Sequence, residues 1–271
     1  MSRTAINPLD TGLDVIDLEN DPSFAKRHLH ARDVATQAEC MERLARAFVE
    51  NPDTILQELV NAAIDLCGAE SAGISVEKDD RTDESFWHWV ATAGEYTPFM
   101  NAELPRYPSA CGLCLERGRP QLFRVNQKFF DIMGVVAPVV TDGLLLPWEV
   151  EGTRGTLWIM AHERTEAFDN DDVRMMQMLA NFAAMGVRQL RLRKIVMEQE
   201  KTAAVAAMAN DLAHKINNPL QALTNQLYIA AHGQSGDTRL MAHEMSEDFE
   251  KLSALVKKLL RLPIDATHPE S

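Results

Sequence analysis

The feature that most constrains this chain is a long, uninterrupted helical stretch in its C-terminal half. Between Asp172 and Ala230 the only glycine is Gly186 and the only proline is Pro219. At 1.5 Å per residue, a continuous helix of this length extends about 85–90 Å, which is more than one small domain can bury. Apolar residues recur along it, so we expect this rod to pair with the rod of a second copy as a coiled coil, giving a parallel homodimer. These apolar positions are Leu179, Phe182, Leu190, Val196, Val205, Met208 and Leu212.

A second, shorter helix is predicted after the rod. Residues 232–237 read HGQSGD, which is typical of a flexible turn, and residues 238–260 again carry apolar side chains at three- and four-residue steps until Pro263. The end of the rod and this returning helix therefore predict an all-α antiparallel hairpin. The apolar positions of the returning helix are Leu240, Met241, Met245, Phe249, Leu252, Val256 and Leu259.

The chain before the rod has the alternating character of an α+β domain. Two amphipathic helices are separated by Asn51-Pro52-Asp53, and β-branched and aromatic residues then follow with a period of two. A loop-rich middle contains one short helical piece near Cys111–Arg117. Two apolar runs around the tetrapeptide 152–155 then predict an antiparallel hairpin. The predicted helices begin near residues 36 and 53, and the predicted strands cover 71–78, 84–94, 143–152 and 155–162.

The charge of the chain argues against two classes of partner. Its 27 basic and 40 acidic residues give a formal net charge of −13, so no basic excess is available to bind nucleic acid or an anionic membrane. Residues 1–22 lack the basic start and apolar core of a signal peptide. The nearest approach to a membrane span, residues 134–148, is interrupted by Thr141, Asp142 and two prolines. We therefore expect a cytoplasmic protein.

His214 faces away from the apolar stripe of the rod. Each helical residue turns by about 100°, which places His214 roughly 200° from both Leu212 and Ile216. Asn218 follows on the same outer face. An imidazole in this position has no packing role, so its alternatives are a solvated surface histidine or a chemically active one. The stripe expected to be buried is Met208, Leu212, Ile216, Leu220 and Leu223.

Pro219 lies one turn beyond this histidine. Its ring crowds the carbonyl of Lys215 and it has no N–H to donate, so it is predicted to act as a hinge. A proline in a helix interior costs about 3 kcal/mol relative to alanine, which is a large penalty to carry without a function.

Residues 214–220, HKINNPL, resemble the H-box HEINNPL of the dimerisation and phosphotransfer (HisKA-type) domain of bacterial sensor histidine kinases, and the resemblance covers residues 202–262. It implies that His214 accepts a phosphoryl group and that Asn218 orients a water that hydrolyses an aspartyl phosphate. Lys215 departs from the pattern, because the family usually has an acid there that accepts a proton from the other imidazole nitrogen. A lysine instead places positive charge near an incoming phosphate.

The sequence contains no glycine-rich nucleotide lid and no Asn-box, and only residues 264–271 follow Pro263. We therefore expect that the chain does not phosphorylate itself. Any phosphoryl group on His214 would come from a partner, either a histidine kinase or the receiver domain of a response regulator.

The chain before the rod resembles a GAF domain over residues 36–185. The segment GTLW, followed by AFDNDD, is similar to the end of many bacterial GAF domains, where such a strand precedes an F-D-x-x-D helix start. This resemblance implies a sensor for a small molecule that the sequence does not identify. It also implies dimerisation through the first and last helices.

No cofactor is identified in this region, and no metal site is expected. Cys111 and Cys114 have the spacing of metal ligands, but a second pair is missing. A bilin is not expected either. Aromatic residues at strand spacing either form plain core or line a ligand pocket. The candidate pocket residues are Trp87, Trp89, Phe99, Tyr107, Cys111, Cys114 and Trp148.

These observations predict a cytoplasmic two-component signalling protein in five parts. They are a flexible leader (1–35), a GAF sensor (36–186), a coiled-coil linker (187–201), a phosphotransfer hairpin (202–262) and a tail (263–271). One alternative is an adapter that docks on and restrains a partner kinase without being phosphorylated. Another is a thiol redox enzyme, because the sequence ACGLC resembles the cysteine loop of GAF-type methionine sulfoxide reductases; the further cysteine of those enzymes is missing here.

Overall fold

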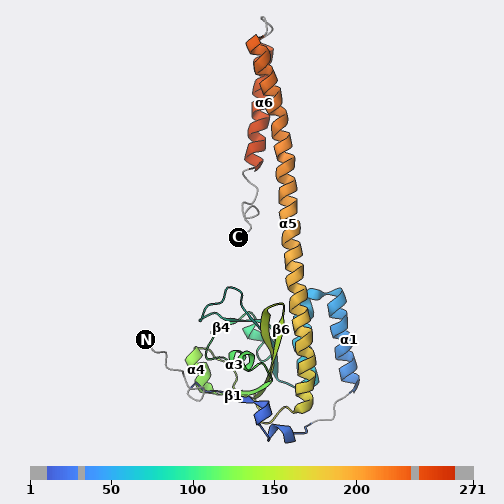
Figure 1. Ribbon diagram of the computed structural model, residues 1–271, viewed down its shortest axis with the longest axis vertical. Coiled ribbons are helices and arrows are strands. Elements are labelled where there is room, and N and C mark those ends of the chain that lie inside the picture. The colour runs from blue at the N-terminus through green and yellow to red at the C-terminus, as the bar shows by residue number, and fades with distance from the viewer. Residues whose placement is uncertain (1–10, 30–33, 233–237, 260–271) are drawn as a thin grey trace. The chain divides into compact units, whose positions relative to one another are not determined.

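The computed structural model describes residues 11–29, 34–232 and 238–259, and it divides into two compact units, residues 1–191 and 192–271 (Figure 1). The long helix α5 (Asn170–His232) contributes to both units. The remaining parts of the predicted leader, the predicted turn at 233–237 and the predicted tail lie outside the described residues.

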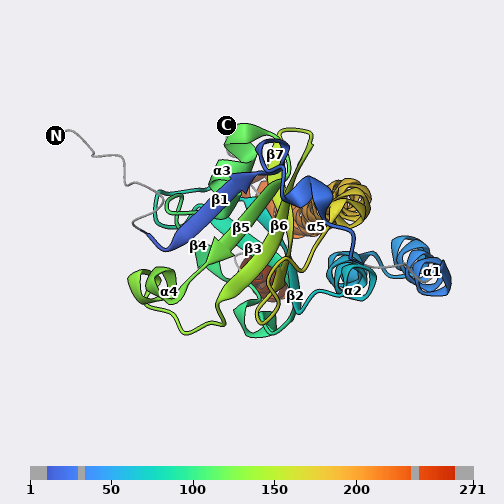
Figure 2. The ribbon, with the colours of Figure 1, turned by 90° about the horizontal axis from the view of Figure 1, so that it is seen from below.

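The first unit is built on one curled antiparallel sheet (Figure 2). Over the described residues its strand order is β1-β5-β6-β7-β2-β3-β4. The α+β class and the strands predicted from alternating residues are confirmed, whereas β1, β4 and β5 were not predicted. The strands are β1 (Leu13–Asp17), β2 (Ser71–Glu77), β3 (Trp87–Gly94), β4 (Glu103–Leu104), β5 (Gln121–Val125), β6 (Val140–Val150) and β7 (Thr153–Ala161).

The β6–β7 hairpin is tighter than the sequence predicts. The predicted turn covered residues 152–155, but β7 already begins at Thr153, and the connection is Glu151-Gly152. Both connecting residues have positive φ, 48° and 77°, as a two-residue hairpin turn that follows the twist of the sheet requires. The hairpin therefore keeps an unbroken register from Asp142 opposite Ala161 to Val150 opposite Thr153.

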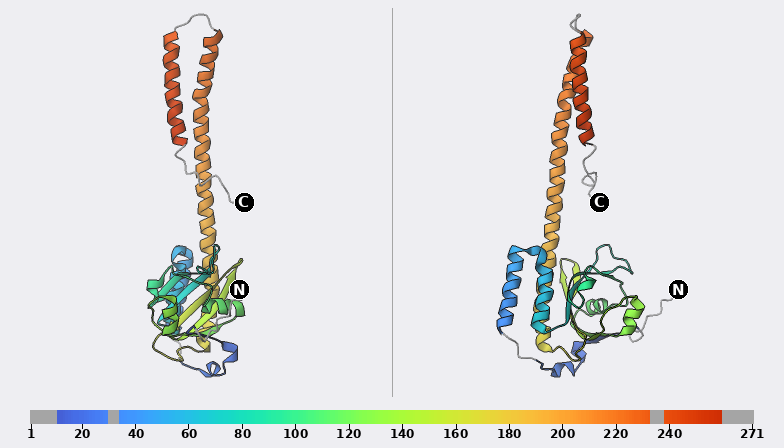
Figure 3. Two further views of the ribbon diagram at one scale, coloured as in Figure 1. Left: turned by 90° about the vertical axis from the view of Figure 1, so that its left-hand side faces the viewer. Right: turned by 180° about the vertical axis from the view of Figure 1, so that it is seen from behind.

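Two helices cover one face of the sheet, α2 (Ile55–Cys67) and the first part of α5, and α1 (Val34–Glu50) packs on the outer side of α2 (Figures 2 and 3). Buried apolar residues of α2 and α5 form one core with alternate residues of the central strands. Gly186 of α5 lies against Leu56 and Ile55 of α2, where an added Cβ would be only 3.0 and 3.1 Å from their side chains. The predicted stripe of α2 is confirmed, because Ile55, Leu59, Ala62, Ala63 and Leu66 are all buried.

The other face carries the short helices α3 (Ala110–Arg117) and α4 (Gln127–Met133). Each begins at a side-chain cap: Ser109 Oγ accepts from the N–H of Gly112, and Asn126 Oδ1 accepts from the N–H of Lys128. Each ends at a glycine in the left-handed conformation, Gly118 and Gly134. The caps and the glycines therefore fix where each helix begins and ends, and both helices pack against an aromatic cluster on the sheet.

The segment predicted as a leader contributes a strand to the sheet, which was not predicted. Leu13–Asp17 pair antiparallel with β5 and extend the sheet by an edge strand. Further on, Arg27 Nη1 lies 2.8 Å from Asp142 Oδ2 of β6, and both side chains are buried. Strand pairing across more than a hundred residues leaves no local periodicity, which explains why the sequence did not predict this strand.

The second unit consists of the remainder of α5 and the helix α6 (Thr238–Leu259), which lie side by side (Figure 3). Gln226 Nε2 of α5 is 3.4 Å from Glu244 Oε2 of α6. Leu212 and Leu223 are buried, but Met208 and Leu220, which the sequence placed in the same stripe, are 53% and 43% exposed. Within the described residues, α6 is the helix beside this part of α5, and it leaves these two side chains uncovered.

Within the helices that the structure describes, none has a segment long and apolar enough to cross a membrane.

Candidate functional site

The first unit contains an aromatic cavity of about 150 Å³ between the sheet and the segments that carry α3 and α4. Trp89, Phe123 and Trp158 contribute rings from three strands, while Phe129 and Phe130 contribute rings from α4. Other lining residues include Tyr96, Phe99, Cys111, Leu145 and Met160. The lining is almost entirely apolar.

Glycines on neighbouring strands make room for two of these rings. A Cβ added at Gly73 of β2 would overlap the indole of Trp158, and one added at Gly143 of β6 would overlap the ring of Phe123. Both rings therefore lie flat over backbone that has no side chain on that side. The rings of Trp158 and Phe123 therefore cover the sheet where it borders the cavity.

The pocket residues predicted from the sequence are only partly brought together. Trp89, Phe99 and Cys111 line the cavity, and Trp87 is buried nearby without lining it. Tyr107 is about half exposed and its hydroxyl bonds Glu116. Cys114 does not line the cavity and contacts the carbonyl oxygen of Leu145, and Trp148 belongs to the core on the opposite face.

Five cavity residues were not predicted from the sequence: Tyr96, Phe123, Phe129, Phe130 and Trp158. Period-two alternation was a usable signal for one of them, because Trp158 and Met160 lie on the same face of β7. The others come from an unpredicted strand, an unpredicted helix and a loop.

The thiol of Cys111 belongs to a closed polar cluster with two buried hydroxyls. Ser75 Oγ lies 2.8 Å from Thr156 Oγ1 and 3.1 Å from Cys111 Sγ, and Thr156 Oγ1 lies 3.2 Å from the same sulfur. Three donors and three acceptors satisfy one another in this triangle. Burial raises the pKa of both Cys111 and Cys114. The reactive thiolate is therefore disfavoured, which weighs against thiol redox chemistry here.

We expect the thiols of Cys40, Cys67, Cys111 and Cys114, all buried, to resist alkylation by iodoacetamide at pH 8.5. The rate in the folded protein should be lower than in urea-unfolded protein by about two orders of magnitude, because burial excludes the reagent and the raised pKa of Cys111 and Cys114 lowers their thiolate fraction. Mass spectrometry of timed digests measures the rate at each position. Fast native labelling of Cys111 would instead support the redox alternative.

Among the described residues, no three histidine, cysteine, aspartate or glutamate side chains come together in a way that would hold a metal ion.

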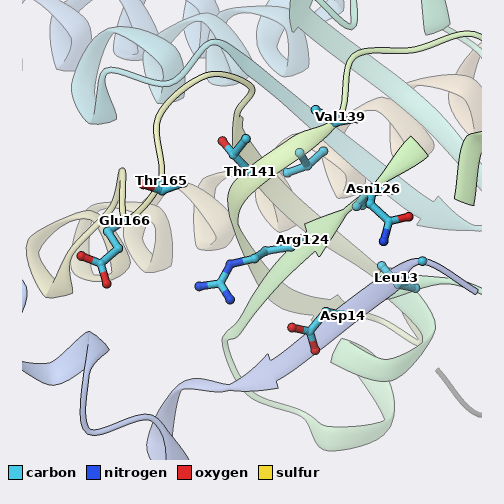
Figure 4. Close-up of a pocket in the computed structure, with 11 residues that line it drawn as sticks. Leu13, Asp14, Arg124, Asn126, Val139, Thr141, Thr165 and Glu166 are labelled. Carbon is cyan, nitrogen blue, oxygen red and sulfur yellow. The ribbon is translucent and has the colours of Figure 1, made fainter. Parts of the chain in front are cut away.

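A second hollow is an open groove at the β1–β5–β6 edge, with a volume of about 750 Å³ (Figure 4). Arg124 projects into it from β5, between Asp14 on one side and Glu166 on the other (Figure 4). One guanidinium nitrogen of Arg124 is 3.9 Å from the buried Asp142. The groove therefore presents charges of both signs.

The second unit carries the histidine predicted from the sequence. His214 is exposed, and the buried Leu212 lies on the opposite side of α5, as the helical period predicts. Asn217 and Asn218 are also exposed, while Pro219 is half-buried within a helix that continues through it.

Lys215 forms an ion pair with Asp211 that was not predicted. Its Nζ lies 2.8 Å from Oδ2 of Asp211, one turn earlier. Asp211 is three residues before His214, so its carboxylate stands on a neighbouring part of the same helix surface. The signal was present in the sequence as an Asp–Lys pair at i, i+4.

Comparisons with known proteins identify the family to which the first unit is similar. A family model described as a GAF domain matches residues 49–188. The GAF domain of an Acinetobacter phosphoenolpyruvate-protein phosphotransferase is 13% identical with a TM-score of 0.46, covering 59% of this chain and 97% of that one. The GAF domain of a sensor histidine kinase described as putative, from Pseudomonas syringae pv. tomato, is 16% identical with a TM-score of 0.39, covering 60% and 93%. No curated protein matches the sequence.

Proposed function

The chain belongs to the GAF domain family through residues 49–188, and on this basis we propose that it is a two-component signalling protein whose GAF domain senses a small molecule. The helices that follow the domain carry a phosphoacceptor histidine, His214. In this proposal the aromatic cavity is the sensing site and α5 transmits its state, because the same helix contributes to the GAF core and bears His214.

The exposure of His214 is the observation that carries the proposal. His214 is exposed and lies opposite the buried Leu212, so its side chain is accessible to a partner protein. Transfer from a phosphorylated partner would form a P–N bond at one imidazole nitrogen while the P–O or P–N bond of the donor breaks. The donor side chain leaves as a carboxylate or as an imidazole.

Lys215 and Asn218 contribute two further functional groups near His214. Lys215 supplies positive charge for the phosphoryl oxygens, and its bond to Asp211 keeps it on the helix surface. Asn218, exposed one turn after His214, would orient a water for hydrolysis of an aspartyl phosphate on a response regulator. Pro219 removes one backbone hydrogen bond from α5 and is the proposed weak point for signalling.

The test is phosphotransfer with a supplied donor. Full-length protein is incubated with labelled ATP and candidate histidine kinases, and the label is assayed as acid-labile, base-stable phosphohistidine. Transfer to wild type but not to a His214 variant supports the proposal, and the protein with ATP alone is the blank.

A homodimer is also part of the proposal. Several apolar side chains of the second unit are between 43% and 61% exposed in one chain, which is unfavourable in water. They include Ile195, Met197, Met208, Leu220 and Leu227 of α5, and Phe249 of α6. A second copy laid along the same helices would cover them.

We expect light scattering at micromolar concentration to give twice the 30.3 kDa mass of one chain. Leu220 and Leu227 are both exposed and lie seven residues apart, so the double variant Leu220→Glu/Leu227→Glu should shift the mass towards the monomer. Asn225→Glu, which places one negative charge on an exposed polar position, is the control and should remain dimeric. A monomeric wild type would contradict the predicted dimer.

A second candidate function is a docking adapter that restrains a partner kinase without being phosphorylated. It is favoured by Lys215, which stands where the phosphotransfer family has an acid and is held by Asp211. In that case wild type and His214→Ala would inhibit the partner equally.

A further inference from the structure

The volume of the aromatic cavity sets an upper limit on what it can hold. It measures about 150 Å³. An apolar cavity of about this volume in a protein interior stays dry and takes up molecules the size of benzene or xenon. The cavity therefore has room for one ring, or for a hydrocarbon of similar size.

The interior of the cavity carries no charge with which to bind an ion. Among the described residues that line it, none is a lysine, arginine or histidine, and Glu103 is the one carboxylate. Glu103 is exposed, so it lies where the cavity meets solvent. It is also engaged, because Lys78 Nζ donates to it at 2.7 Å and the Ser85 hydroxyl donates to it as well. A charged ligand would therefore lose its hydration without gaining an opposite charge.

The polar side chains that line the cavity are bonded within the protein. The Tyr96 hydroxyl donates to the carbonyl oxygen of Pro138 at 2.9 Å. The thiol of Cys111 belongs to the triangle with two buried hydroxyls described above. Ser109 Oγ accepts from the N–H of Gly112 at 3.3 Å. A polar group on a ligand would therefore have to compete with bonds that already exist.

The two indoles of the lining present carbon atoms to the cavity. Trp89 and Trp158 both line it, and their ring centroids are 4.9 Å apart. Their Nε1 atoms have no acceptor, but both atoms are fully buried, so the accessible part of each ring is hydrocarbon. The remaining lining is aliphatic, aromatic or methionine side chains, which offer dispersion contacts and apolar surface alone.

We propose that the cavity binds a small apolar molecule, up to about one ring in size, that carries neither a charge nor a hydrogen-bonding group. Burial of apolar surface and close packing supply its affinity. The inference rests on the proposed sensing function and names its ligand class. Binding is measured without any kinase present, so the result is independent of whether His214 takes up phosphate.

The test uses matched probes on the full-length protein, followed by calorimetry and by ligand-observed NMR. Toluene and phenol have nearly the same shape, but phenol replaces the methyl group by a hydroxyl. Benzoate and benzylammonium carry an anion and a cation, and 1-methylnaphthalene adds a second ring. We expect saturable binding of toluene. Phenol should bind at least about tenfold more weakly, because its hydroxyl leaves water without gaining a partner. Neither charged probe nor 1-methylnaphthalene should bind saturably.

Two variants change the volume of the cavity in opposite directions. Ala102→Leu adds bulk to the lining and should weaken toluene at least about tenfold. Met133→Ala removes a lining side chain and should admit 1-methylnaphthalene while still binding toluene. Ala45→Leu makes the same exchange as the first variant at an exposed position of α1, and it should bind all probes like wild type. Circular dichroism of each variant confirms that the fold is retained.

Absence of saturable toluene binding to wild type would overturn the proposal, whatever the outcome of phosphotransfer to His214. Phenol bound as tightly as toluene would show that the cavity supplies a polar partner, and a preference for either charged probe would show that it supplies a charge; both results contradict an apolar ligand. Unchanged binding of every probe by Ala102→Leu and Met133→Ala would place the bound toluene outside this cavity.

Discussion

His214→Ala is expected to abolish phosphoryl transfer to this protein from its cognate donor. If the imidazole is the acceptor, its removal eliminates the atom that forms the P–N bond, so labelling should fall to that of the blank. Folding and dimerisation should change little, because the side chain is exposed and lies opposite Leu212. The measurement is acid-labile label on the full-length chain after incubation with kinase and labelled ATP.

Two controls separate chemistry from general damage. His28→Ala removes another exposed histidine, in the first unit, and should be labelled like wild type. Asn218→Ala should still accept label but lose any ability to dephosphorylate a response regulator, because it retains the nucleophile and removes the group that orients water. Equal labelling of wild type and His214→Ala would show that the histidine is not the acceptor, and the docking function would then be favoured.

Arg27→Met is expected to destabilise the first unit by about 3–5 kcal/mol, the usual effect of removing one partner from a buried ion pair. Arg27 and Asp142 have side chains only 4% and 0% exposed, and their nearest atoms are 2.8 Å apart. The same Asp142 oxygen accepts from the N–H of Ala167 at 2.9 Å. Urea unfolding of wild type and variant at pH 7 gives the difference in the free energy of unfolding.

The loss should shrink as the pH falls. Burial raises the pKa of Asp142, and Arg27 opposes this shift, so removal of the arginine raises the pKa further. An acid whose pKa is higher in the folded state than in the unfolded state stabilises the fold when protonated, and this contribution is lost as the pH rises through the folded-state pKa. The difference between wild type and variant should therefore be smaller at pH 4 than at pH 7.

A double variant and a surface control complete this test. Arg27→Met/Asp142→Asn removes both charges but keeps an oxygen for the N–H of Ala167, so it should recover most of the lost stability. Arg119→Met breaks an ion pair with Asp17 and Glu19 that is partly exposed to solvent, and it should cost at most about 1 kcal/mol. Similar losses for Arg27→Met and Arg119→Met would contradict a special role for the buried pair.

Features with a local period could be predicted from the sequence. The helices over 34–50 and 55–67, the β6–β7 hairpin and the long helix α5 each repeat their pattern within a few residues. Features that depend on distant partners could not. The strand Leu13–Asp17 forms its hydrogen bonds with β5. The buried Asp142 forms an ion pair with Arg27, which lies 115 residues earlier in the chain.

The same distinction between local pattern and distant contacts applies to the residues of the candidate sites. The sequence by itself determined that His214 faces outwards, because a helix turns by a fixed angle at each residue and the apolar stripe marks its inner side. Alternation along a strand likewise puts Trp87 and Trp89 on one face of β3. Only the tertiary structure decided that Trp89 lines a cavity, that Trp87 does not, and that Trp148 packs under helices on the other face. The reason is that a strand fixes the side to which a residue points, whereas the elements packed against that side decide whether it meets a cavity or a filled core.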